Sequence, residues 1–149
     1  MDLDRPEEIL LTPLSIIPTE GGAVLHALKS SAAGYSGFGE AYFSAVDYGA
    51  VRAWKKHQKM TMNLVVPVGR IKFVFEKAQS HGRQSGFEEV ILSRENYQRI
   101  TVPPGIWFGF QGLAQTGSIL LNIASIEHDP AEALRADLEF LPYDWSLVE

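Results

Sequence analysis

Short apolar segments separated by turn-forming residues run through most of this chain and constrain its fold more than any other feature. From Leu10 to Ala124 these segments are rich in Val, Ile, Phe, Tyr and Thr, and Gly, Pro and Ser clusters interrupt them. Such residues favour β-strands, with turns at the interruptions. Short strands at this spacing predict an all-β sandwich or barrel rather than alternating βα units. The candidate strands are Ile9–Ile17, Val24–Leu28, Gly37–Val46, Met62–Val68, Ile71–Phe75, Glu88–Leu92, Gln98–Val102, Trp107–Gln111 and Ser118–Ala124.

A helical pattern is confined to the end of the chain. Asp129 can cap a helix, Pro130 suits its first turn, and Ala131–Leu138 are good helix formers. Leu134 and Leu138 stand four residues apart, on a face that could pack against the barrel. We therefore expect a short C-terminal helix.

Length and composition fit one domain over residues 1–149, with 46% apolar residues to build a core. The net charge of -5 argues against nucleic acid or an anionic membrane as a partner. There is no cysteine, which excludes disulfides, thiolate metal sites and cysteine nucleophiles. The acidic N-terminus lacks the apolar stretch of a signal peptide, and no apolar run could span a bilayer. We expect a cytoplasmic protein.

One candidate strand places a carboxylate among aromatic residues. In Gly37–Phe43, Phe38, Glu40 and Tyr42 alternate and share one face. If that face points into the barrel, burial of Glu40 is costly unless the carboxylate is hydrogen-bonded or functional.

Two stretches resemble the paired motifs of the cupin superfamily. The first is Gly49-Ala-Val-Arg-Ala-Trp-Lys-Lys-His57 with a closing Gly69, and the second is Val102-Pro-Pro-Gly-Ile-Trp-Phe108. The resemblance implies a double-stranded β-helix, which is a jelly-roll barrel. Of the four metal ligands of cupins only one histidine, His57, is present. The other histidine positions are occupied by Lys55 and Phe108, and the carboxylate position by Thr61 or Met62. A divalent site usually needs at least three ligands, so we expect no metal and no cofactor.

Within this superfamily, the chain resembles metal-free nucleotide-sugar epimerases and isomerases. The run from Leu92 to Gly105 resembles the Leu-Ser-x-Glu-Asn…Ile-Pro-x-Gly run of dTDP-4-dehydrorhamnose 3,5-epimerases, and Gly37–Tyr42 is similar to the strand that opens their active site. The run from Arg52 to His57 resembles the Arg-Gly-x-His-x-His of dTDP-sugar 3,4-ketoisomerases, and Ala124–Asp129 resembles their Ala-Ser-x-x-Tyr-Asp.

The resemblance implies proton abstraction next to a 4-keto group, which needs a base, an acid and a group that stabilises the enolate. His57 stands where these families place the base; otherwise it is a hydrogen-bonded core histidine. Lys55 shares its strand face and would hold the enolate or a phosphate while lowering the pKa of His57, or it is an exposed strand lysine.

The sequence offers two candidate proton donors and assigns no partner to the histidine. Ile126 and Glu127 occupy the positions of the epimerase tyrosine, which leaves His128 and Tyr42 as candidate donors. The aspartate that the epimerases place against the catalytic histidine has no assigned counterpart. Asp144 could serve only if the tail folds back or reaches a neighbouring subunit.

Three further residues are candidates for substrate binding. Arg52 matches an arginine near the substrate diphosphate, although it could equally be a surface residue. Glu40 belongs to the strand that opens the active site, and Trp107 could stack on a base or sugar. We expect Phe110 to be a core residue.

The leading hypothesis is a nucleotide-sugar epimerase or isomerase in the synthesis of lipopolysaccharide or other surface-polysaccharide precursors. The alternative is a catalytically silent cupin that binds a sugar nucleotide or another small ligand, and a structural subunit of a glycan-assembly complex is a third. Proteins of this branch are commonly dimers, and Ile9–Ile17 could pair with a partner sheet, so we expect a homodimer.

Overall fold

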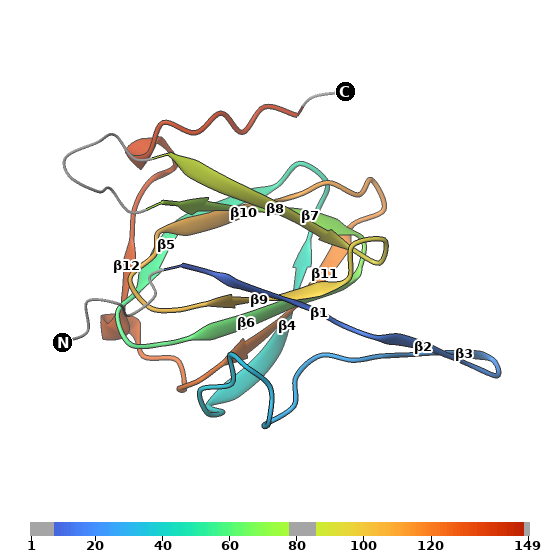
Figure 1. Ribbon diagram of the computed structural model, residues 1–149. Coiled ribbons are helices and arrows are strands. Elements are labelled where there is room, and N and C mark those ends of the chain that lie inside the picture. Colours follow the sequence, from blue (N-terminus) through green and yellow to red (C-terminus); the bar gives the residue numbers. More distant parts are fainter. Residues whose placement is uncertain (1–7, 78–85, 148–149) are drawn as a thin grey trace.

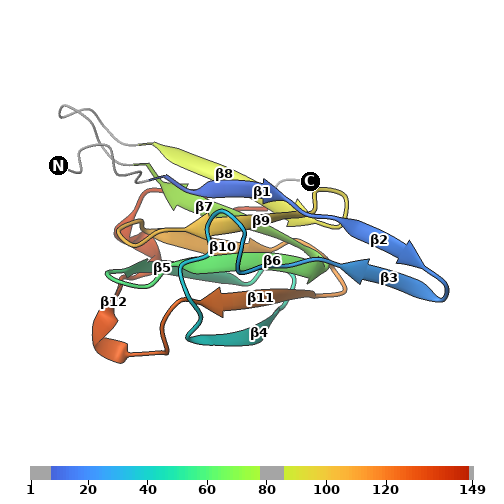
Figure 2. The same cartoon turned by 60° about the horizontal axis from the view of Figure 1, so that its bottom comes forward.

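The computed structural model describes residues 8–77 and 86–147 and confirms the all-β jelly-roll prediction. Two five-stranded antiparallel sheets face each other and enclose the interior (Figures 1 and 2). The first sheet has the order β1 (Leu10–Pro13), β9 (Gln98–Val102), β6 (Met62–Val68), β11 (Ser118–Ala124) and β4 (Glu40–Val46). The second has the order β12 (Ala133–Arg135), β5 (Val51–His57), β10 (Phe108–Gly112), β7 (Arg70–Glu76) and β8 (Phe87–Ser93). Within the described part of the chain, no helix is long and apolar enough to cross a membrane.

The core lies between the two sheets. Leu64, Ile71, Phe73, Ile100 and Leu120 are almost completely buried there. Burial alternates along β11, where every second residue is buried, as expected for a strand with one face on the core. The same alternation turns the polar Asn122 inward, between Leu120 and Ala124.

Several predicted strands have different bounds, and apart from β12 one strand was absent from the predicted set. Ile9–Ile17 is divided into β1 and β2 (Ile16–Thr19), and in place of Val24–Leu28 the strand β3 spans Gly22–Leu25. The missed strand is β5, whose arginine, lysines and histidine obscure the apolar pattern. These polar side chains are tolerated because several of them face a cavity instead of the core.

The prediction of a C-terminal helix over Ala131–Leu138 is wrong. Asp129 does cap a turn, its Oδ1 accepting from the backbone N of Ala131 at 3.1 Å, but that 3-10 turn, η1, spans only Pro130–Glu132. The chain then forms β12, because the edge of β5 offers backbone groups that pair with it. Leu134 and Leu138 are exposed rather than packed on the barrel, and a second short turn, η2, follows at Leu138–Phe140.

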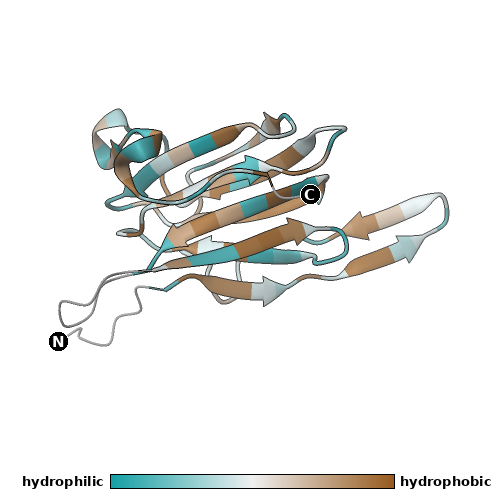
Figure 3. Cartoon of the chain, turned by 90° about the horizontal axis from the view of Figure 1, so that it is seen from above, coloured by the Kyte–Doolittle hydropathy of each residue, from teal (hydrophilic) through white to brown (hydrophobic). Residues whose placement is uncertain are grey.

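A two-stranded hairpin, β2–β3, projects from the barrel (Figure 1). Its side chains include Ile17 and Val24, whose exposed fractions are 46% and 49%. Figure 3 shows hydrophobic residues along this projection. The hairpin thus presents apolar surface that the described part of the chain does not cover.

Candidate active site

A cavity of about 480 Å³ lies between the two sheets. Its volume falls within the usual range for small-molecule sites. Met62, Phe108 and Phe110 supply apolar wall, and none of the described residues that line the cavity is acidic. The polar and charged lining residues are Tyr42, Ser44, Arg52, Lys55, His57, Asn122 and Arg135.

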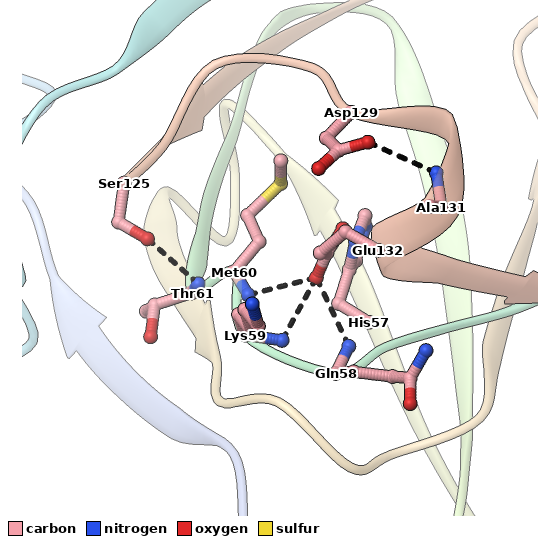
Figure 4. A network of polar contacts seen from close by, with 9 residues as sticks. All are labelled: His57, Gln58, Lys59, Met60, Thr61, Ser125, Asp129, Ala131 and Glu132. Atoms are coloured by element: carbon pink, nitrogen blue, oxygen red, sulfur yellow. Dashed lines mark hydrogen bonds and ion pairs between the residues drawn. The ribbon is translucent and has the colours of Figure 1, made fainter.

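His57 and Glu132 form a buried pair at this cavity. The Nδ1 atom of His57 lies 2.8 Å from Oε1 of Glu132, and the exposed fractions of the two residues are 7% and 5%. Figure 4 shows the glutamate reaching from η1 toward the end of β5. Sequence reasoning found the histidine and missed its partner.

The other carboxylate oxygen of Glu132 binds the backbone that follows His57. Oε2 accepts hydrogen bonds from the backbone N–H groups of Gln58, Lys59 and Met60 at 3.0, 2.9 and 2.9 Å (Figure 4). Burial alone would raise the pKa of Glu132, but the hydrogen bonds from His57, Lys59 and Met60 outweigh it and lower the pKa to about 2. The carboxylate is therefore ionised at neutral pH.

Strand pairing brings this glutamate to the histidine. Ala133 is in register with His57 across the β12–β5 ladder, and the backbone N of Gln58 donates to the carbonyl of Glu132 at 3.1 Å. The Asp129 cap fixes the turn in which Glu132 lies. The helix that we expected over this segment would have removed that pairing.

The electrostatic environment keeps His57 neutral. Burial lowers its pKa, the charges of Lys55 and Arg135 lower it further, and Glu132 opposes them. A neutral imidazole donates its Nδ1–H to the carboxylate and keeps the lone pair on Nε2. Since His57 lines the cavity, its arrangement suits a base.

Cations occupy the same side of the cavity as the histidine. Lys55 is half-buried, and burial and then the charge of Arg135 lower its pKa. Arg52 is exposed and donates from Nη2 to the carbonyl of Ala45 at 3.0 Å. These groups make the cavity attractive to an anion.

Tyr42 faces His57 from the other sheet. It lies on β4 and lines the cavity, whereas His57 lies on β5. Burial and then the charge of Glu40 raise the pKa of Tyr42, so its hydroxyl remains protonated at neutral pH. Nearby, Asn122 donates from Nδ2 to Oγ of Ser44 at 3.2 Å, another polar contact on this wall.

The other proposed site residues do not line the cavity. Glu40 begins β4 and acts on the cavity only through its charge on Tyr42. The ring of Trp107 packs against Phe140 at a centroid distance of 4.9 Å, and His128 is exposed between β11 and η1. The structure therefore groups His57, Lys55, Tyr42 and Arg52 and leaves Glu40, Trp107 and His128 outside.

The structure adds to what the sequence indicated for three neighbouring residues. Phe110 lines the cavity as well as packing against the core. Asp144 accepts hydrogen bonds from Ser146, while Glu132 takes the place beside His57 for which Asp144 was considered. Arg135, like Glu132, was missed because both fall in the segment that we expected to be helical.

A search of the described residues finds no group of three or more His, Cys, Asp or Glu side chains arranged to hold a metal ion. The absence of a bound metal or cofactor stays a prediction.

Comparison with known proteins places these features in a family, although no family model matches the chain. A dTDP-sugar isomerase from Desulfovibrio desulfuricans G20 is 37% identical, with a TM-score of 0.87 over 96% of this chain and 94% of that one. A probable low-salt glycan biosynthesis epimerase from Haloferax volcanii is 29% identical over 105 residues. That match covers 69% of this chain and 65% of the curated relative's length.

More distant structures share the fold. A dTDP-4-dehydrorhamnose 3,5-epimerase from Elizabethkingia anophelis NUHP1 has a TM-score of 0.74 at 15% identity, covering 96% of this chain and 84% of that one. A sugar 3,4-ketoisomerase from Thermoanaerobacterium thermosaccharolyticum, solved with TDP, has a TM-score of 0.70 at 17% identity, covering 89% of this chain and 90% of that one.

The match to the Desulfovibrio isomerase agrees with the fold and with the buried histidine at the cavity. The chain therefore belongs to the cupin-fold family of nucleotide-sugar isomerases and epimerases.

Proposed function

We propose that this protein is a nucleotide-sugar epimerase or isomerase that removes a proton from the carbon next to a 4-keto group. The observation that carries the proposal is the buried His57–Glu132 pair at the wall of a cation-lined cavity. A hydrogen-bonded carboxylate fixes the tautomer of a histidine base and stabilises the imidazolium that forms when it takes a proton. Family membership and the names of the relatives support the same reaction class.

Three cavity residues have roles in this reaction. Nε2 of His57 takes the proton from carbon, the electron pair of the C–H bond forms a C–C double bond, and the π pair of the C=O bond moves onto the ketone oxygen, which gives an enolate. The ammonium of Lys55 stabilises that negative charge. For epimerisation, the hydroxyl of Tyr42 returns a proton to the same carbon from the opposite face, since β4 and β5 belong to facing sheets.

Ketoisomerisation uses the same base differently. The enolate oxygen takes up a proton and the neighbouring hydroxyl gives one up, so that the ketone moves to the adjacent carbon. His57 then returns its proton to the carbon that carried the ketone. In ketoisomerisation Tyr42 acts only on oxygen-bound protons. Epimerisation and ketoisomerisation therefore differ in which ring carbon receives hydrogen from solvent.

The charge of the cavity supports a sugar nucleotide as substrate. Arg52, Lys55 and Arg135 line it, and the described lining includes no carboxylate. A diphosphate carries the negative charge that such a site attracts, and arginine can bind phosphate oxygens in a bidentate manner. A neutral free sugar would leave these cations without a partner.

The test is incorporation of solvent deuterium into a dTDP-4-keto-6-deoxyhexose, followed by NMR at each ring carbon. Deuterium at carbons flanking the ketone together with a changed product supports the proposal. Binding without exchange or product would identify the alternative, a catalytically silent cupin that binds a sugar nucleotide. Neither binding nor exchange across a panel of nucleotide sugars would contradict both.

We also propose a cytoplasmic role in making surface-polysaccharide precursors such as those of lipopolysaccharide. The Haloferax relative, named as a glycan biosynthesis epimerase, supports a role of this kind. Deleting the gene and analysing surface glycans for a missing or altered deoxysugar tests it. An unchanged sugar composition would contradict the assignment.

We further propose that the protein is a homodimer in which the β2–β3 hairpin packs on a second copy. The exposed Ile17 and Val24 on a projecting hairpin support this, because such apolar surface is usually covered. Light scattering of the purified protein should give twice the chain mass. The double substitution Ile17→Asp and Val24→Asp should shift it toward the monomer, whereas Leu134→Asp on exposed β12 should not.

A further inference from the structure

Arg135 is a cation at the cavity that no sequence motif indicated. It is the last residue of β12, it is exposed, and it lines the cavity. Its charge lowers the pKa of Tyr42, Lys55 and His57, which places the guanidinium near groups from both sheets. Within the described residues, no ion pair joins Arg135 to a carboxylate.

The position of Arg135 in the sheet makes an anionic ligand favourable. The β12–β5 register sets Arg135 directly opposite Lys55. Like charges at directly opposite positions of an antiparallel pair destabilise it. An anionic substrate that contacts both side chains converts the repulsion into two attractions, and an arginine adds paired N–H donors for phosphate oxygens.

The order of charges along β5 matches the order of groups in a sugar nucleotide. At a rise of about 3.4 Å per residue, the Lys55–Arg135 level lies about 7 Å along the strand from His57, and Arg52 lies further along β5, beyond an irregularity in its pairing with β10. In the substrate, the reacting carbons are followed by the phosphate attached to the sugar and then by the phosphate attached to the nucleoside.

On the basis of the proposed function, we infer that Arg135 binds the sugar-proximal phosphate of the substrate, while Arg52 binds the nucleoside-proximal phosphate. The first phosphate lies beside Arg135 when the ketone-bearing carbons reach His57 and the enolate oxygen reaches Lys55. Arg135 thereby selects nucleoside diphosphates over nucleoside monophosphates.

Nucleotide binding by calorimetry tests this without requiring turnover. We would measure the Kd of dTDP and dTMP for the wild-type protein and for Arg135→Gln, Arg52→Gln and Arg70→Gln. Arg70 is exposed at the start of β7 and is not a cavity residue, so it is the matched control. The wild-type protein should bind dTDP at least about tenfold more tightly than dTMP, as expected for one charge-assisted phosphate contact.

The variants should separate the two arginines. Arg135→Gln should weaken the binding of dTDP alone, so that the Kd of dTMP is no more than about twofold that of dTDP. Arg135→Lys should restore part of the preference for dTDP. Arg52→Gln should weaken both nucleotides and keep the ratio, and Arg70→Gln should change neither. A wild-type ratio in Arg135→Gln overturns the inference while leaving the proposed function intact, and failure of the wild-type protein to bind dTDP overturns both.

Discussion

Replacing Glu132 by glutamine should abolish the base function of His57 while keeping the shape of the site. The carboxylate accepts one hydrogen bond from His57 and three from backbone N–H groups. A glutamine has one acceptor oxygen, which should turn toward the three backbone donors. Its NH₂ group then faces Nδ1 of His57, so the imidazole must carry its proton on Nε2, the atom that should accept the substrate proton.

The expected losses of turnover and of stability follow from the geometry of the pair and from the pKa of Glu132. A histidine in the wrong tautomer cannot take a proton, so turnover should fall by at least about 10²-fold and up to roughly 10⁴-fold. Folding lowers the pKa of Glu132 from 4.5 to about 2, and this shift contributes about 3 kcal/mol to the free energy of unfolding. Because the folded-state pKa is the lower one, this stability is present above pH 4.5 and is lost as the pH falls toward 2. The glutamine variant should lack that pH dependence.

Three measurements check the prediction. Deuterium exchange into the 4-keto sugar nucleotide reports turnover, and ¹⁵N NMR of the His57 ring reports which nitrogen carries the proton. Urea unfolding between pH 7 and pH 3 reports the acid-dependent stability. Glu127→Gln is the matched control because Glu127 is exposed close to the same segment.

Wild-type exchange rates in a folded Glu132→Gln protein would refute the reasoning, since Glu132 would then not orient the base. An unchanged Nδ1–H tautomer in that variant would also refute it, because the amide would have kept its oxygen on the histidine. If the variant unfolds at neutral pH, Glu132→Asp retains the charge on a shorter side chain. It should fold, with exchange reduced and the tautomer unchanged.

Three further predictions concern the other cavity residues. His57→Gln should fold and lose at least about 10²-fold in exchange rate, since glutamine cannot act as a base; normal exchange in the folded variant would contradict the assignment. Lys55→Met should reduce turnover less and should raise the pKa of the acidic limb of the pH–rate profile, because the lysine charge lowers the pKa of His57; an unmoved limb would contradict this coupling. Tyr42→Phe should block product formation but keep deuterium exchange at the carbon that His57 deprotonates if the enzyme is an epimerase, and full product formation would exclude Tyr42 as the donor.

The fold and half of the candidate site could be predicted from the sequence. Strand-forming segments with Gly and Pro between them predicted the barrel, because local propensity and turn chemistry act over a few residues. The Arg52–His57 motif identified cavity residues, since alternate strand positions share a face and Lys55 and His57 both line the cavity. By contrast, the same alternation suggested that Glu40 would join Tyr42, yet Glu40 begins β4 and lies outside the cavity lining.

The partner of His57 was decided only by tertiary structure. The segment after Asp129 has helix-forming residues, and its local sequence gives no reason to end the turn at Glu132. The chain leaves the helical path there because the edge of β5, distant in sequence, offers backbone partners to β12. That pairing brings Glu132 to His57 and Arg135 to Lys55. Sequence patterns thus determined most of the segments that became strands. The choice of neighbouring strand, which depends on contacts between distant residues, made β12 a strand and determined which charges meet in the cavity.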